Sequence, residues 1–168
     1  SLSIDISKKT EKMIAIKFDI SKASDTLING ININIKEDAS AKILLLYEST
    51  DDSNHYHNGY VRVNLSDNSN LELINLQNLN GESKNLTQTD FVVNSNVNLE
   101  YYDLELGSKV NAVAAKARFL GENSNVLFVP AYLVDGYRKA DFEYSMLFHG
   151  KKNEGNIEGR GATKDHGL

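Results

Sequence analysis

The sequence contains no cysteine. Within this chain, that absence excludes a disulfide scaffold, a zinc site built from thiolates and a cysteine nucleophile. It fits a reducing compartment, so we expect a cytoplasmic protein, although secreted proteins can also lack cysteine.

Other absences narrow the class further. The net charge is −5 and the basic residues are scattered, so we expect no nucleic-acid partner and no membrane partner. No stretch approaches the roughly 20 apolar residues that span a bilayer, and the first residues do not resemble a signal peptide. The single proline, Pro130, lies inside a strand-like run, where it marks a bend, a bulge or a strand end. No 3.6-residue period persists, which predicts little or no α-helix.

What the sequence does contain is a phrase that recurs. Its clearest copy is Asn68–Leu73, and the other copies are Asp38–Ile43, Asn96–Tyr101, Asn123–Phe128 and Glu154–Gly159. The small residue of each copy recurs at steps of about 30, 28, 27 and 31 residues. Each copy is a polar turn followed by apolar residues at every second position, and a turn that feeds a strand at a fixed period indicates one coil of a β-solenoid.

We therefore predict an all-β protein, a right-handed parallel β-helix of about five to six coils. With 168 residues, it is long enough for one domain with a real core. We expect residues 1–168 to be one solenoid domain and a piece of a longer protein, because the chain opens without methionine. The repeat predicts an inner column of Leu71, Leu99, Val126 and Ile157, a second inner column of Ile43, Leu73, Tyr101 and Phe128, and a ladder of Asn70, Asn98, Asn125 and Asn156.

Period-2 alternation locates the strands. The expected strands are Leu2–Ile6, Met13–Ile20, Ile31–Ile35, Ile43–Tyr47, Val61–Leu65, Thr87–Val93, Leu99–Leu106, Val110–Leu120 and Val126–Val134. Thr50–Gly59 is expected as a loop. Leu76–Ser83 is expected as a turn region in which Gly81 takes a positive φ.

Two groups of side chains could carry chemistry. His55 and His57, beside Asp51 and Asp52, resemble a metal-ligand cluster, since imidazole and carboxylate suit zinc, iron or nickel. No third anchored ligand is evident, so a polar loop with a chance histidine pair is the simpler interpretation. A second cluster combines acids and bases that could act on a polysaccharide, although charges beside a turn are usually a solvated rim. Its members are Asp135, Arg138, Lys139, Asp141 and Glu143.

Two further patterns carry little signal. Gly159-Arg160-Gly161 lacks the order of a phosphate-binding loop. Ser69, Ser124 and Ser145 have no evident histidine and aspartate partners for nucleophilic catalysis.

Several segments together resemble the SufB/SufD family of iron–sulfur cluster assembly proteins, over roughly residues 35–168. They are Leu44–Ser49, Leu65–Asn78, Leu106–Lys109, Phe119–Ser124, Ala131–Gly136, Asp141 and Met146–His149. Asp141 and His149 match family positions, where we expect a structural role. Tyr137–Lys139 replaces a glutamine-containing stretch and Ala112–Lys116 lacks a Tyr-Pro pair, so SufB, SufD and a single-paralogue version stay open.

The resemblance implies a parallel β-helix core that pairs with a SufB/SufD-type paralogue or a second copy, and a SufC-type ABC ATPase as partner. It also implies that the sulfur-accepting cysteine, the cluster-site residues and the ATPase-docking helices lie downstream of Leu168. This segment is then expected to hold no cofactor, while an iron–sulfur cluster forms transiently in the full-length complex. We expect a non-catalytic scaffold; the alternatives are a carbohydrate-acting β-helix enzyme and a surface-binding solenoid.

Overall fold

The computed structural model describes residues 1–165, and every regular element in that range is a β-strand. One sheet, here sheet A, has six strands: β1 (Leu2–Ile6), β3 (Thr26–Ile35), β5 (Tyr56–Leu65), β7 (Lys84–Val93), β9 (Val110–Phe119) and β11 (Lys139–Phe148). The other, sheet B, has seven strands: β2 (Ile14–Ile20), β4 (Ser40–Ser49), β6 (Asn70–Asn78), β8 (Asn98–Glu105), β10 (Asn125–Val134), β12 (Glu154–Ile157) and β13 (Arg160–Thr163).

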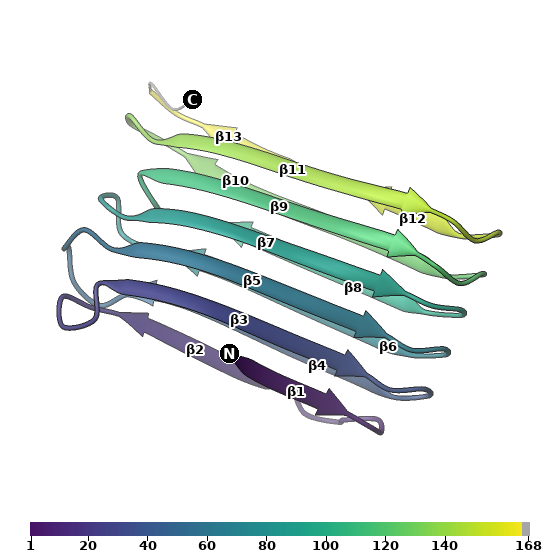
Figure 1. Ribbon diagram of the computed structural model, residues 1–168. Helices are drawn as coiled ribbons and strands as arrows, with labels where there is room; N and C mark the ends of the chain where they lie inside the picture. The colour runs from purple at the N-terminus through teal and green to yellow at the C-terminus, as the bar shows by residue number, and fades with distance from the viewer. Residues whose placement is uncertain (166–168) are drawn as a thin grey trace.

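Successive strands alternate between the two sheets, so each coil contributes one strand to each. Every strand pair within a sheet is parallel, as between β5 and β7 or β6 and β8. The chain runs along the front sheet, returns along the rear sheet and climbs one coil per circuit, which is a right-handed winding (Figure 1). The prediction of a right-handed parallel β-helix of about five to six coils is confirmed.

The corner turns, which join each sheet A strand to the next sheet B strand, explain the repeated phrase. The first residue of the phrase adopts the left-handed conformation in Asp38, Asn68 and Asn96, with φ of 57°, 59° and 56°. Asn and Asp tolerate that region better than other residues with a Cβ. The same conformation recurs at Asn123 and at Lys152.

The predicted inner columns are correct except in the last coil. Leu71, Leu99 and Val126 are stacked in register, but Gly155 follows Val126, whereas Ile157 follows Phe128 in the second column. The left-handed residue of the last corner is Lys152, so the last copy of the phrase begins two residues earlier than predicted. A shift of two keeps a residue on the same face of its strand and moves it to the next column.

The predicted asparagine ladder is wrong in position. Asn70, Asn98 and Asn125 are in register but exposed, and Asn156 pairs with Leu127. The amide ladder instead joins the left-handed residues of the corner turns. Asn96 Nδ2 donates to Asn68 Oδ1 over 3.0 Å, and Asn123 Nδ2 donates to Asn96 Oδ1 over 2.9 Å.

Three strands of sheet A begin earlier than predicted. β3 begins at Thr26, β5 begins at Tyr56 inside the predicted loop, and β7 begins at Lys84. The added residues point polar side chains inward, which hides the apolar alternation from a sequence pattern. The prediction for Gly81 is also wrong: the positive φ values of these loops belong to Ser108 and Gly136.

Pro130 lies buried in the middle of β10. β10 therefore does not end at Pro130 as one of the predicted alternatives had it. The interruption lies instead in the strand that pairs with β10 in the next coil, where β12 ends at Ile157 and β13 begins at Arg160. Proline has no N–H to donate across this gap.

The apolar core fills the half of the interior that lies next to the corner turns. Ile35, Leu65, Val93 and Phe119 end their sheet A strands there, and all are fully buried. The rings of Phe91, Tyr101 and Phe128 pack together behind them, with centroids 5.0 to 5.5 Å apart. At about 25 cal/mol per Å² of apolar area, each such side chain contributes roughly 1.5–3 kcal/mol.

Candidate functional site

The interior of the solenoid is divided into an apolar half and a polar half. The polar half lies nearer the loops that join sheet B to sheet A, where sheet A strands begin and sheet B strands end. Sheet A contributes His57, Asn85 and Asn111, which share one register. Sheet B contributes two inward positions per strand: Asn75 and Gln77 of β6, and Asp103 and Glu105 of β8. We call these seven side chains, together with Asn29 of β3, Tyr47 of β4 and Tyr144 of β11, the interior network.

Two carboxyl groups occupy the centre of the interior network. Asp103 and Glu105 are two residues apart in β8, so both side chains point inward, and they are 0 % and 1 % exposed. Asn75 Nδ2 bridges them, 2.8 Å from Asp103 Oδ1 and 3.3 Å from Glu105 Oε1. Tyr144 donates its hydroxyl proton to Asp103 Oδ2 over 2.8 Å.

Amide groups surround the second oxygen of Glu105. Asn111 Nδ2 donates to Glu105 Oε2 over 2.7 Å and Gln77 Nε2 donates over 3.0 Å. Asn85 Nδ2 lies 3.5 Å from the same oxygen and donates to Asn111 Oδ1 over 2.8 Å. The donors therefore point toward the carboxyl pair from three successive coils.

His57 continues this chain of hydrogen bonds. Its Nδ1 lies 2.6 Å from Asn85 Oδ1 and its Nε2 lies 2.9 Å from the side-chain amide of Asn29, while its ring stacks on Tyr47 at 4.4 Å. Burial lowers the pKa of His57 to about 4, so the imidazole is neutral near pH 7. Because Asn85 directs its NH₂ group at Asn111 and Glu105, its oxygen accepts from Nδ1–H. The atom of Asn29 that faces Nε2 is Oδ1, while Asn29 Nδ2 donates to the Tyr47 hydroxyl over 3.4 Å.

The carboxyl pair holds one proton, because two buried negative charges without a cationic partner would repel each other. Among residues 1–165, no lysine or arginine forms an ion pair with either carboxyl. Burial raises the pKa of Glu105 well above its ordinary value, and the neighbouring Asp103 charge raises it further. Burial also raises the pKa of Asp103, and hydrogen bonds from Asn75 and Tyr144 oppose that rise. We infer that Glu105 keeps the proton and that Asp103 carries the charge.

The sequence patterns missed most of the interior network. Only His57 was singled out, and as a metal candidate. The available signal was parity: Asp103 and Glu105 continue the inward positions of Leu99 and Tyr101, so a strand assigned over these residues places both carboxyls inside. The donors were detectable in the same way, at matching positions one period earlier or later.

The two histidines of the predicted metal cluster have different surroundings. His57 belongs to the interior network, while the buried His55 lies in the loop before β5, where its Nε2 is 3.1 Å from Asp51 Oδ1. That contact has the distance of an ion pair without the alignment of a hydrogen bond. Backbone N–H groups of Lys22 and Ser53 hold the pKa of Asp51 down at about 2. Within residues 1–165, no three His, Cys, Asp or Glu side chains gather as a metal-ligand set.

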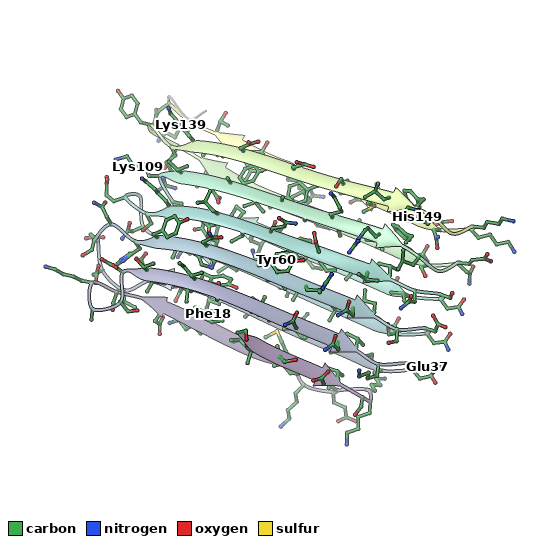
Figure 2. All side chains as sticks on the ribbon, viewed as in Figure 1. Phe18, Glu37, Tyr60, Lys109, Lys139 and His149 are labelled. Carbon is green, nitrogen blue, oxygen red and sulfur yellow. The ribbon has the colours of Figure 1, made fainter. Side chains whose placement is uncertain are left out.

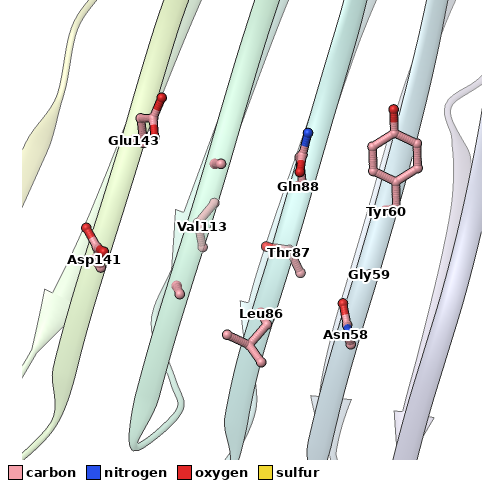
Figure 3. A pocket seen from close by; sticks show the side chains of 11 residues that line it. Asn58, Gly59, Tyr60, Leu86, Thr87, Gln88, Val113, Asp141 and Glu143 are labelled. Carbon is pink, nitrogen blue, oxygen red and sulfur yellow. The ribbon is translucent and has the colours of Figure 1, made fainter.

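The proposed acid–base cluster divides into two parts. Asp135 and Arg138 form an ion pair of 3.0 Å across the turn before β11. Asp141 and Glu143 instead line a shallow trough on the outer face of sheet A (Figure 3). Lys139 begins β11 and His149 follows its end, so these two residues lie at opposite ends of one strand (Figure 2).

The three serines lie in different places, and two of them have structural roles. Ser69 Oγ donates to Ser66 O over 2.6 Å and Ser124 Oγ donates to Asn94 O over 2.7 Å, both in corner turns. Ser145 lies on the outer face of β11 beside Lys116, with its hydroxyl oxygen inaccessible to solvent. Gly159-Arg160-Gly161 crosses the gap between β12 and β13, in strand rather than in a loop before a helix.

Fold and interior together define the class: a two-sheet parallel β-solenoid with a closed polar half and no helix among residues 1–165. No helix in this range is available to cross a membrane. The family model for the SUF system FeS cluster assembly, SufBD core domain, matches residues 18–168. The chain therefore belongs to the SufBD core domain family, a component of iron–sulfur cluster assembly by the SUF system. No curated protein matches the chain.

Proposed function

We propose that this protein is a non-catalytic scaffold subunit of the SUF machinery. It pairs with a SufB/SufD-type paralogue or a second copy of itself, and a SufC-type ABC ATPase binds the resulting assembly in the cytoplasm. The iron–sulfur cluster is the cargo of that complex. The observation that carries the proposal is the family match over residues 18–168.

The architecture supports a scaffold. Two hydrogen-bonded sheets run through all six coils, and their interior is filled by the apolar core and the interior network. Such a body moves as a unit, because each coil is held to its neighbours by backbone ladders and packed side chains. The carboxyl groups best placed for proton transfer, Asp103 and Glu105, are closed to any substrate.

The test is co-purification. The tagged full-length protein is co-expressed with the SufC-type ATPase and the SufB/SufD-type paralogue of the same genome, and the recovered complex is reconstituted anaerobically with iron and sulfide. We expect both partners to be retained and a cluster to form only in the complex. Leu99→Asp buries a carboxylate in the apolar core and should unfold the solenoid. This variant is the negative control, and we expect it to lose both partners.

Two outcomes contradict the proposal. Loss of both partners together with cleavage of a uronate polymer indicates the carbohydrate-acting enzyme. Loss of both partners together with retention on a cell surface indicates the surface-binding solenoid.

A further inference from the structure

The trough on the outer face of sheet A has a floor of alanine methyl groups. Ala112 and Ala114 of β9 alternate with buried residues and therefore point outward. They are flanked by Leu86 and Gln88 of β7 and by Asp141 and Glu143 of β11. Asn58 and Tyr60 of β5 lie beyond Leu86 and Gln88 (Figure 3). We call this surface the β9 trough. Neighbouring strands are about 4.8 Å apart, so the walls stand about 10 Å apart, which is the thickness of one extended chain with its side chains.

The acidic wall of the trough is not neutralised by the protein itself. Asp141 and Glu143 are exposed, and within residues 1–165 neither carboxylate makes a hydrogen bond or an ion pair. Several other surface carboxylates in strands do have partners, as in the Lys42–Glu72 pair at 2.7 Å.

The charge changes sign along the same strip. The next two outward residues of β9 after Ala114 are Lys116 and Arg118, which also lack a carboxylate partner within residues 1–165. Beside them are Ser145 and Leu147 on β11, and Asp90 and Val92 on β7. Asp90 is held by hydrogen bonds from the Tyr60 hydroxyl and from Gln88 Nε2. Read along β9 and β11, the charges are therefore acidic and then basic, with Asp90 as the one carboxylate of the β7 wall.

We propose that the β9 trough docks an extended segment of a partner protein that carries two basic side chains at alternate positions, followed by two acidic ones. Alternate side chains of an extended chain are about 6.8 Å apart, which is also the separation of Asp141 and Glu143 along β11. The basic pair meets Asp141 and Glu143, and the acidic pair meets Lys116 and Arg118. The order of the charges makes the segment run parallel to β9. This surface is independent of the proposed SUF function, so the two succeed or fail separately.

The test uses two synthetic peptides of identical composition. Both have threonine at odd positions; the forward peptide has lysine at the first two even positions and glutamate at the next two, and the reversed peptide has the opposite order. Binding to ¹⁵N-labelled protein is followed by chemical-shift changes. We expect the forward peptide to bind more tightly, with the largest changes at Ala112 and Ala114, and to weaken as salt is added.

Variants decide whether the charges act. Asp141→Asn combined with Glu143→Gln is expected to weaken binding of the forward peptide several-fold, up to about tenfold. Glu37→Gln, an exposed carboxylate in a corner turn, is the matched control and leaves binding unchanged. Equal binding of the two peptides, shift changes elsewhere, or an unchanged affinity in the double variant would overturn the proposal. The peptide comparison on the unmodified protein stands even if the double variant folds poorly.

Discussion

Replacing Glu105 by glutamine tests the interior network through the pH dependence of stability. The folded protein holds a proton on the Asp103–Glu105 pair, whereas both side chains of the unfolded chain ionise near pH 4. Because burial raises the folded pKa of Glu105, its stabilising contribution is complete below about pH 4. It is lost progressively as the pH rises toward the folded pKa.

His57 has the opposite dependence, which fixes the window of the measurement. Burial lowers its pKa from 6.5 to about 4, so the unfolded chain binds the additional proton between those values. Stability from His57 is therefore present above pH 6.5 and is lost as the pH falls to 4. Below pH 6.5, His57 and the carboxyl pair change the free energy of unfolding with pH in opposite directions. Above pH 6.5, only the carboxyl pair makes the free energy of unfolding depend on pH.

The size of the effect follows from one proton. Between pH 6.5 and the folded pKa of Glu105, the unfolding equilibrium constant increases up to tenfold per pH unit, or about 1.4 kcal/mol. With an unfolding entropy of about 2.1 cal/mol/K per residue, a chain of 168 residues loses about 4 °C of Tm per pH unit. The window closes below the titration of the tyrosines, where burial raises the pKa of Tyr47 to about 12.

The assay is thermal unfolding followed by circular dichroism from pH 6.5 to 9. Wild-type Tm is expected to fall with pH, and Glu105→Gln is expected to remove most of the fall, because its NH₂ group can occupy the place of the acid proton. Glu143→Gln, on the outer face, is the control and keeps the wild-type slope. A flat wild-type profile, or equal slopes in wild type and Glu105→Gln, would refute the shared proton.

Three further substitutions test other features, each by its urea midpoint. Asn96→Ala loses the corner ladder and puts a less tolerant residue at φ 56°, for an expected cost of about 1–2 kcal/mol; Asn96→Gly should cost less. Gly107→Ala places a Cβ against the carbonyl oxygen of Leu79, so we expect a loss of about 3 kcal/mol or more. Phe91→Ala empties a fully buried site and should cost about 3–5 kcal/mol, with Phe91→Leu clearly milder.

The repeated phrase was sufficient to predict the solenoid because it combines two independent signals. The left-handed turn residue marks each corner, and the alternation after it marks the face of each sheet B strand. Leu71, Leu99 and Val126 follow their corners by the same interval, so their register could be counted. Sheet A strands follow loops of unequal length, and their starts could not be counted in the same way.

The candidate site was harder to predict because its residues look like loop residues. Asn29, His57 and Asn85 are inward members of strands, but a polar residue at an inward position interrupts the apolar alternation. A pattern that reads polarity as exposure therefore ends the strand at that point. The pairing of donors and acceptors between coils is a tertiary property, which depends on which strands become neighbours.

The polar half also explains why the coils adopt one register. A slip of two residues keeps every inward side chain inside, and among aliphatic residues such as Leu71 and Leu99 it exchanges one apolar contact for another. In the polar half, the same slip would take Glu105 away from Gln77 and leave a buried carboxyl without its donors, at a cost of several kcal/mol. Register is therefore specified by the costly groups rather than by the apolar ones. The last coil agrees with this view: β12 and β13 contribute no member to the interior network, and there the sequence pattern misplaced Ile157 by two residues.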